Sequence, residues 1–161
     1  MPNATVRANA QAMPKAGRLV GAPLPDDLAY MPDQYAMPVI GDCLAPEVRD
    51  GALLIFDKTA AYNPGDLVVV FLRSATPGEQ PRALVKRLIM APPSWVKAFP
   101  FEDHPESDVL ALIGVEQINP QRRFTIRCAA ILAIHKCLGE APANASLDFA
   151  PIPSARKEIA Q

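Results

Sequence analysis

Cys43 and Lys86 are the two residues of this chain whose types and order could together perform acyl-transfer chemistry. Cys43 lies in the turn-like sequence Gly-Asp-Cys-Leu, and Lys86 lies 43 residues later in the apolar sequence ALVKRL. A thiol can attack a carbonyl carbon, and a lysine amine can act as a general base where apolar neighbours favour its neutral form. The two residues therefore predict a nucleophile and base pair.

Both residues also have a plainer interpretation. Free cysteine is among the most buried residue types, so Cys43 could simply fill core space, and Lys86 could be an exposed strand lysine. Cys128, His135 and Cys137 carry metal-ligating groups, but on one extended strand residue 128 would lie more than about 20 Å from the other two, at about 3.3 Å per residue. We predict neither a metal site nor a cofactor.

The elements that must position these residues are predicted to be short β-strands. Eighteen prolines against eight glycines disfavour long helices, because proline interrupts helix interiors. Turn sequences such as Asn63-Pro64-Gly65-Asp66 separate apolar, β-branched runs. The residues AAILAIHKCL, 129–138, fit a helix or a strand, and we favour the strand. The strand candidates are residues 35–40, 52–57, 67–72, 82–90, 95–99, 109–116 and 124–136, which makes about seven.

One domain is expected, because 161 residues can bury a single core without disulfide or metal support. Residues 1–17 and 139–161 resemble weakly ordered tails, which leaves 18–138 as the folded domain. The net charge of −1 predicts no general attraction to nucleic acid. Three cysteines without a CxxC pair, together with the absence of a signal peptide or membrane-spanning run, predict a reduced, cytoplasmic protein with no membrane contact.

Three motifs resemble the peptidase domain of the LexA and UmuD family, which shares its fold with signal peptidases. They are VIGDCLAPEVRDGALLIFDKT (39–59), YNPGDLVVVFL (62–72) and ALVKRL (83–88). The family shows a Gly-x-Ser-Met turn, an x-Asp-Gly-Asp turn before a strand, a Gly-Asp strand and a Val-Lys-Arg strand. The similarity covers about residues 18–138, and three motifs in the same order are more specific than any one of them.

The resemblance implies a small, mostly β fold, a Ser-Lys dyad that cleaves a bond in the protein's own N-terminal segment, and a homodimer. By position Cys43 replaces the serine, Lys86 is the general base, and Gly41, Asp42 and Leu44 frame the turn. The amide of Cys43 is the first candidate for the oxyanion donor. Ala16-Gly17 is the bond that matches the family's cleavage site.

Two departures from the family pattern shape the expected function. Cysteine stands in place of serine and Leu44 in place of methionine, so the pair would exchange a thiol proton. The roughly 35 residues before the first predicted strand contain five prolines and predict no helix-turn-helix DNA-binding domain. The expected function is a self-cleaving or peptide-cleaving protein. The alternative is a catalytically impaired regulatory module of prophage or stress-response (SOS) type, and a RecA-like or polymerase partner is implied by resemblance alone.

Overall fold

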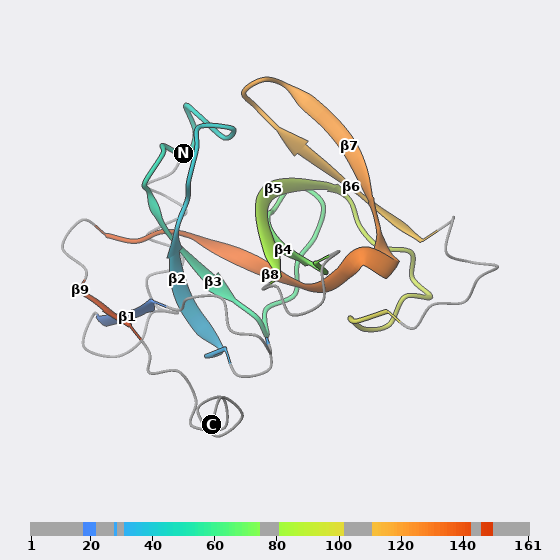
Figure 1. Ribbon diagram of the computed structural model, residues 1–161, viewed down its shortest axis with the longest axis horizontal. Helices are drawn as coiled ribbons and strands as arrows, with labels where there is room; N and C mark the ends of the chain where they lie inside the picture. Colours follow the sequence, from blue (N-terminus) through green and yellow to red (C-terminus); the bar gives the residue numbers. More distant parts are fainter. Residues whose placement is uncertain are drawn as a thin grey trace.

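The computed structural model describes residues 18–21, 28, 31–74, 81–101, 111–142 and 146–149 as one mostly β body (Figure 1). The strands form one sheet in the order β7-β6-β5-β4-β8-β3-β2-β1-β9. Seven of them, β2 to β8, pair antiparallel, whereas β1 pairs parallel with both β2 and β9. The strands are β1 (Arg18–Gly21), β2 (Gln34–Pro38), β3 (Leu53–Asp57), β4 (Leu67–Leu72), β5 (Arg82–Met90), β6 (Leu112–Gln117), β7 (Arg122–Arg127), β8 (Ile131–Glu140) and β9 (Ser146–Phe149).

The predicted mostly β fold is confirmed, with two corrections to the strand candidates. Residues 95–99 form the end of a turn followed by irregular backbone and a bend rather than a strand, and the amide of Val96 donates to the carbonyl of Pro93 at 2.9 Å. Prolines at 92, 93 and 100 flank this segment and lack the N–H group that a strand ladder requires. Residues 124–136 form two strands, because a 3-10 turn at Cys128–Ala130 ends β7 before β8 begins.

Two strands contain residues beyond position 138, the C-terminal boundary of the domain expected from the sequence. β8 continues to Glu140, and Ser146–Phe149 forms β9 beside β1, within the segment expected to be a tail. The expected tail at residues 1–17 lies outside the described residues, as does 150–161. In the described part of the chain, no helix is long and apolar enough to cross a membrane.

Strand β4 lies between two hydrophobic clusters and explains why its sequence is a continuous apolar run. Val69 and Phe71 belong to the first cluster, whereas Val68 and Val70 belong to the second, and all four are fully buried. A strand buried on both faces shows no alternation of polar and apolar residues. The first cluster also includes Tyr35, Leu44, Val48, Leu54, Phe56 and Cys137, and the second includes Leu88, Ile113, Val115, Ile126, Cys128 and Ile131.

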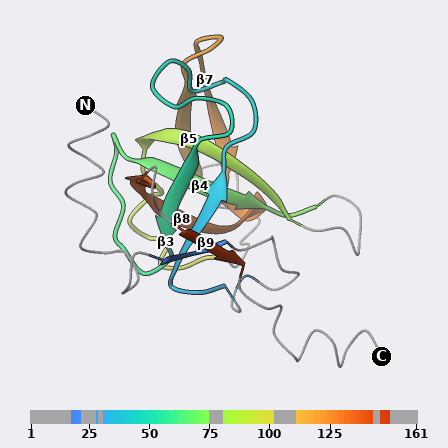
Figure 2. The same ribbon diagram turned by 90° about the vertical axis from the view of Figure 1, so that its left-hand side faces the viewer.

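Strand β5 carries Lys86 and curves from β4 toward β6 (Figures 1 and 2). The predicted turn before β4 is confirmed: Gly65 has a φ of 100°, and the amide of Asp66 donates to the carbonyl of Asn63 at 3.0 Å. The amides of Gly65 and Leu88 then join this turn to β5, since each donates to the other segment. The ladder with β6 shifts register between Leu88 and Met90, which bends the strand just after Lys86.

Candidate active site

The turn that carries Cys43 follows β2 and is closed by short-range hydrogen bonds. Gly41 has a φ of 95°, a conformation that L-residues rarely adopt, and its amide donates to Asp50 Oδ1 at 2.8 Å. The amide of Ala45 donates to the carbonyl of Asp42 at 3.0 Å. These bonds hold residues 41–45 in one conformation, with Gly41 and Asp42 exposed and Cys43 half-buried.

Leu44 and Val48 anchor the turn in the first hydrophobic cluster. Leu44 is 1% exposed and Val48 is 5% exposed, and the amide of Val48 donates to the carbonyl of Leu44 at 3.0 Å. Both side chains belong to the first hydrophobic cluster, so this turn is fixed from its inner side. Burial of Leu44 fixes the position of its neighbour Cys43 at the border between core and solvent.

The backbone of Cys43 is also held by the turn that connects β6 with β7. The amides of Ile118 and Asn119 donate to the carbonyl of Cys43 at 2.8 and 2.9 Å. The amide of Cys43 itself has no acceptor among the residues that the structure describes. An oxyanion donor must have an N–H group with no other acceptor, and the assignment of this role to the Cys43 amide stays a prediction.

A salt bridge ties the same turn to β5. Arg87 pairs with Glu47 of the turn, and its other terminal nitrogen donates to the carbonyl of Gly65 at 2.6 Å. Arg87 is adjacent to Lys86, so this contact fixes the part of β5 that faces the nucleophile turn. The Cys43 turn therefore has attachments to the core, to the β6–β7 turn and to β5.

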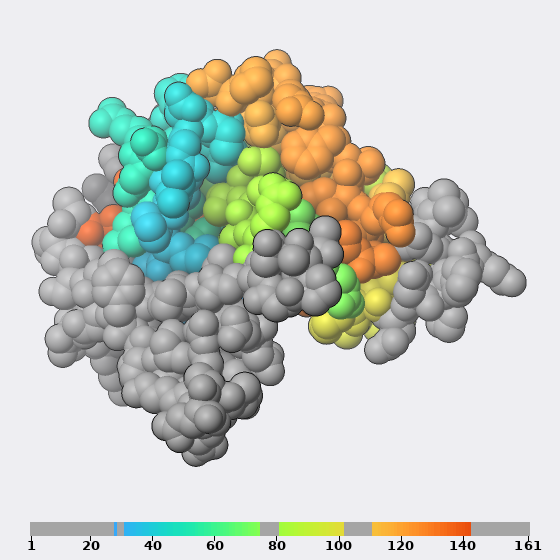
Figure 3. Space-filling view, in the orientation of Figure 1, coloured from blue at the N-terminus to red at the C-terminus, as the bar shows by residue number. Residues whose placement is uncertain are grey.

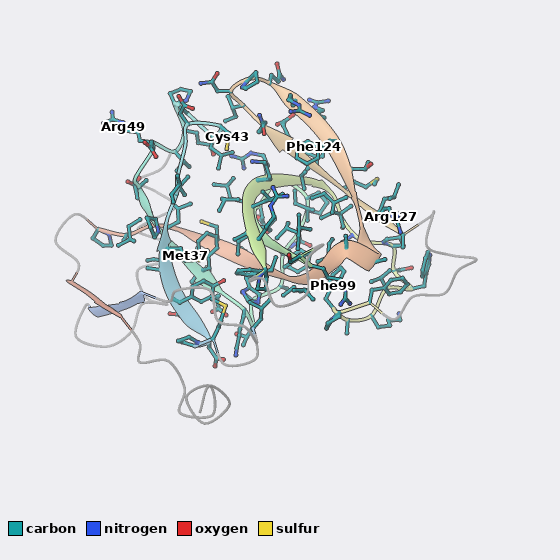
Figure 4. The ribbon with its side chains drawn as sticks, viewed as in Figure 1. Met37, Cys43, Arg49, Phe99, Phe124 and Arg127 are labelled. Atoms are coloured by element: carbon teal, nitrogen blue, oxygen red, sulfur yellow. The ribbon has the colours of Figure 1, made fainter. Side chains whose placement is uncertain are left out.

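Lys86 and Cys43, distant in sequence, meet at the centre of this arrangement. The Lys86 Nζ donates to the Cys43 Sγ at 3.3 Å, and Lys86 is only 7% exposed. In Figure 4 the Cys43 side chain lies on the side of its turn that faces β5, while Arg49 points away. Figure 3 shows the green atoms of β5 between the cyan atoms of β2 and the turn that follows it and the orange atoms of β6 and β7.

This pair has the geometry needed for proton exchange between a nucleophile and a base. The Nζ–Sγ distance lies within the range for a hydrogen bond to sulfur, and Cys43 as a residue is half-buried rather than enclosed in the core. Searches of protein-family models, of curated proteins and of solved structures found no match to this chain. The LexA and UmuD resemblance therefore depends on the motifs alone.

The expected cleavage bond, Ala16-Gly17, lies outside the described residues. Arg18, the first described residue after it, begins β1, which runs parallel to β2. Arg18 therefore lies near the N-terminal end of β2, whereas Cys43 follows the C-terminal end of that strand. The first described residue after the expected bond is thus at the end of β2 remote from the nucleophile.

Three contributors to the site were not predicted from the sequence: Glu47, Ile118 and Asn119. Ile118 and Asn119 act through their backbone amides, which every residue except proline has, so their side chains carry no signal. The Asn119-Pro120 sequence indicated only that a turn would follow the strand. The charge of Glu47 and the opposite charge of Arg87 were visible, but their contact depends on the fold.

Cys128, His135 and Cys137 do not come together. Cys128 belongs to the second hydrophobic cluster and Cys137 to the first, while the Nδ1 of His135 shares a 2.6 Å hydrogen bond with the hydroxyl of Tyr35. Within the described ranges, no group of three His, Cys, Asp or Glu residues could hold a metal ion. His135 therefore has a structural hydrogen bond, and the two cysteines occupy separate cores.

Gly41→Ala is expected to lower the free energy of unfolding by about 1–2 kcal/mol, because an L-residue is strained at this positive φ. A Cβ at this position would meet no heavy atom within 4 Å, so the loss should come from the backbone alone. Urea unfolding followed by circular dichroism measures the change. Gly41→Asn is the matched control, since asparagine tolerates positive φ better and should lose less. Equal stability of Gly41→Ala and the unmodified chain would contradict this account.

Proposed function

We propose that this protein is a peptidase that cleaves peptide bonds with Cys43 as nucleophile and Lys86 as general base. The observation that carries the proposal is the 3.3 Å contact between Lys86 Nζ and Cys43 Sγ, made by a lysine that is 7% exposed. Burial of a lysine side chain costs free energy unless a polar partner compensates for the lost water. Buried ionisable groups that contact a second ionisable group are therefore candidates for functional sites. The motif order that resembles LexA and UmuD supports the same assignment.

The proposed reaction follows from the positions of these groups. Lys86 takes the thiol proton, and the Cys43 thiolate attacks the substrate carbonyl carbon while the amide of Cys43 donates to the oxyanion. The ammonium of Lys86 then gives its proton to the departing amine, which leaves a thioester on Cys43. Neutral Lys86 finally takes a proton from water, and the resulting hydroxide attacks the thioester carbonyl, which releases the carboxyl product and the Cys43 thiolate. The Lys86 ammonium then returns its proton to the sulfur, which restores the thiol and the neutral amine.

The position of β1 affects whether the cleaved segment comes from the same chain or from another molecule. Arg18 lies at the end of β2 remote from Cys43, which favours a segment from a second molecule, or a separate peptide, over the chain's own Ala16-Gly17 bond. A homodimer, the family expectation, would supply such a segment from its partner. The substrate that we propose is therefore an extended peptide containing an Ala-Gly bond, delivered in trans.

Incubation of the full chain at mildly alkaline pH tests this proposal. We expect a cut between Ala16 and Gly17, or cleavage of an added peptide that spans this sequence, detected by intact mass spectrometry. In a mixture of the Cys43→Ala variant and unmodified protein, the variant chain should also be cut, because the cleavage occurs in trans. Absence of any cut, together with thiol labelling of Cys43 no faster than free cysteine, would instead support the impaired regulatory module.

A further inference from the structure

The three cysteines of this chain lie in environments that differ in their susceptibility to oxidation. Cys43 is half-buried, whereas Cys128 is fully buried and Cys137 is 8% exposed. Burial raises the pKa of Cys128 and raises the pKa of Cys137 to about 12, which keeps both as thiols. Oxidants react with accessible thiolates, so Cys43 is the cysteine that a peroxide should oxidise first.

The group that faces the Cys43 sulfur is an amine rather than a second thiol. Lys86 Nζ is 3.3 Å from Cys43 Sγ, while Cys128 lies in the second hydrophobic cluster. Cys137 belongs to the first cluster, but its thiol donates to the carbonyl of Gly139 at 4.0 Å, and none of the three cysteines forms a disulfide. A sulfenic acid condenses with a nearby thiol or with a nitrogen, and the nitrogen product is a sulfenamide. Around Cys43 the structure offers a nitrogen at contact distance.

From this geometry we propose that peroxide converts Cys43 and Lys86 into a covalent, reversible sulfur–nitrogen crosslink. Peroxide first oxidises the Cys43 thiol to a sulfenic acid and is itself reduced to water. The neutral amine of Lys86 then attacks the sulfenic sulfur, the S–N bond forms, and the hydroxyl leaves with an amine proton as a second water. The sulfur is oxidised by two electrons in total, and the chain loses two hydrogen atoms.

The attachments of the site favour the crosslink over further oxidation. Three contacts hold the Cys43 turn against the rest of the sheet: the buried Leu44, the amides of Ile118 and Asn119, and the salt bridge of Glu47 with Arg87. They keep the sulfur beside the amine, so the second step is an intramolecular reaction with a high effective concentration. A thiol reductant attacks the sulfur and releases the Lys86 amine as a mixed disulfide forms on Cys43, and a second thiol then reduces that disulfide and restores the Cys43 thiol.

The crosslink would regulate the site by removing its nucleophile and its base in one step. This regulatory role depends on the proposed function, whereas formation of the crosslink depends only on the contact between Sγ and Nζ. A chain that crosslinks yet never cleaves a peptide would uphold the crosslink and overturn the proposed peptidase. A chain that cleaves peptides, yet gains only oxygen on peroxide treatment, would uphold the proposed peptidase and overturn the crosslink.

Treatment of the full-length protein with a small excess of hydrogen peroxide tests the crosslink by intact mass spectrometry. We expect a species lighter by two hydrogen atoms, a tryptic peptide that joins the Cys43 and Lys86 segments, and complete reversal by dithiothreitol. Lys86→Arg keeps the charge but should give the sulfenic, sulfinic or sulfonic acids instead, while the matched control Lys97→Arg should crosslink as the unmodified chain does. Cys43→Ala should lose the lighter species.

Two outcomes would overturn the crosslink. One is that the unmodified chain gains oxygen without ever losing two hydrogen atoms, although circular dichroism shows that it is folded. The other is that Lys86→Arg and Lys86→Met still give the lighter species, which would assign the nitrogen to a backbone amide beside Cys43. Both variants are needed because Lys86→Met removes the charge and Lys86→Arg preserves it.

Discussion

Lys86→Met is expected to lower the rate of peptide cleavage by at least roughly 100-fold, the lower end of the usual contribution of a general base. The variant removes the amine that lies 3.3 Å from the Cys43 sulfur, while a side chain of similar length fills the same buried position. The thiol then has no adjacent base, and the departing amine has no adjacent proton donor. The same variant should reduce the rate at which a thiol probe labels Cys43.

The cleavage rate of an added peptide, measured at several substrate concentrations, checks this expectation. A general base acts in the transition state, so kcat should fall while KM changes little. Lys97→Met is the matched control, because Lys97 is exposed and lies outside the Cys43 site. If Lys86→Met retains the kcat of the unmodified protein and its unfolding midpoint, Lys86 is not the base.

Acidification from about pH 6.5 to about pH 4 is expected to reduce the free energy of unfolding by roughly 3 kcal/mol through His135 alone. His135 is 5% exposed, and burial lowers its pKa from 6.5 to about 4, with Lys58 adding to the shift and Asp57 opposing it. The unfolded chain therefore binds a proton in this window that the folded chain excludes. Stability rises with pH from about 4 to about 6.5 and is lost as pH falls through that range.

The surroundings of His135 show why protonation is unfavourable. The Tyr35 hydroxyl contacts Nδ1 at 2.6 Å, and the rings of Tyr35 and Phe71 pack edge-on against the imidazole. His135 also lines an open pocket of about 290 Å³ to which the cationic residues Lys58 and Lys97 contribute. Neither lysine can neutralise an imidazolium, and Asp57 is engaged with Thr59 and Gln34.

Urea unfolding across this pH range, with and without His135→Gln, measures the contribution of His135. Glutamine can accept a hydrogen bond from Tyr35 but does not titrate, so the variant should lose the slope between about pH 4 and about pH 6.5. The pKa of Asp57 is lowered from 3.8, so its contribution lies at more acidic pH and should persist. An unchanged slope in the variant would show that other groups control the acid sensitivity.

Much of the fold could be predicted because its strands have strong local signals. The run LVVVFL matches β4 at both ends, and RALVKRLIM matches β5, since β-branched residues between turn sequences favour strands. The turn at Gly65 was predicted from proline and glycine chemistry alone. The prediction of a strand at residues 95–99 is wrong because it gives more weight to their apolar side chains than to the flanking prolines. Those prolines lack the N–H groups that pairing with a neighbouring strand requires.

By itself, the sequence of this chain determined a mostly β architecture, the turns at Gly41 and Gly65, and the choice of Cys43 and Lys86 as the candidate nucleophile and base. These are local properties, set by which φ angles, side-chain shapes and functional groups each residue carries. Only the tertiary structure decided that the Cys43 sulfur and the Lys86 amine meet at 3.3 Å, and that the amides of Ile118 and Asn119 hold the Cys43 carbonyl. Contacts between residues far apart in the chain depend on strand order, register and curvature, and these arise from the packing of the whole core.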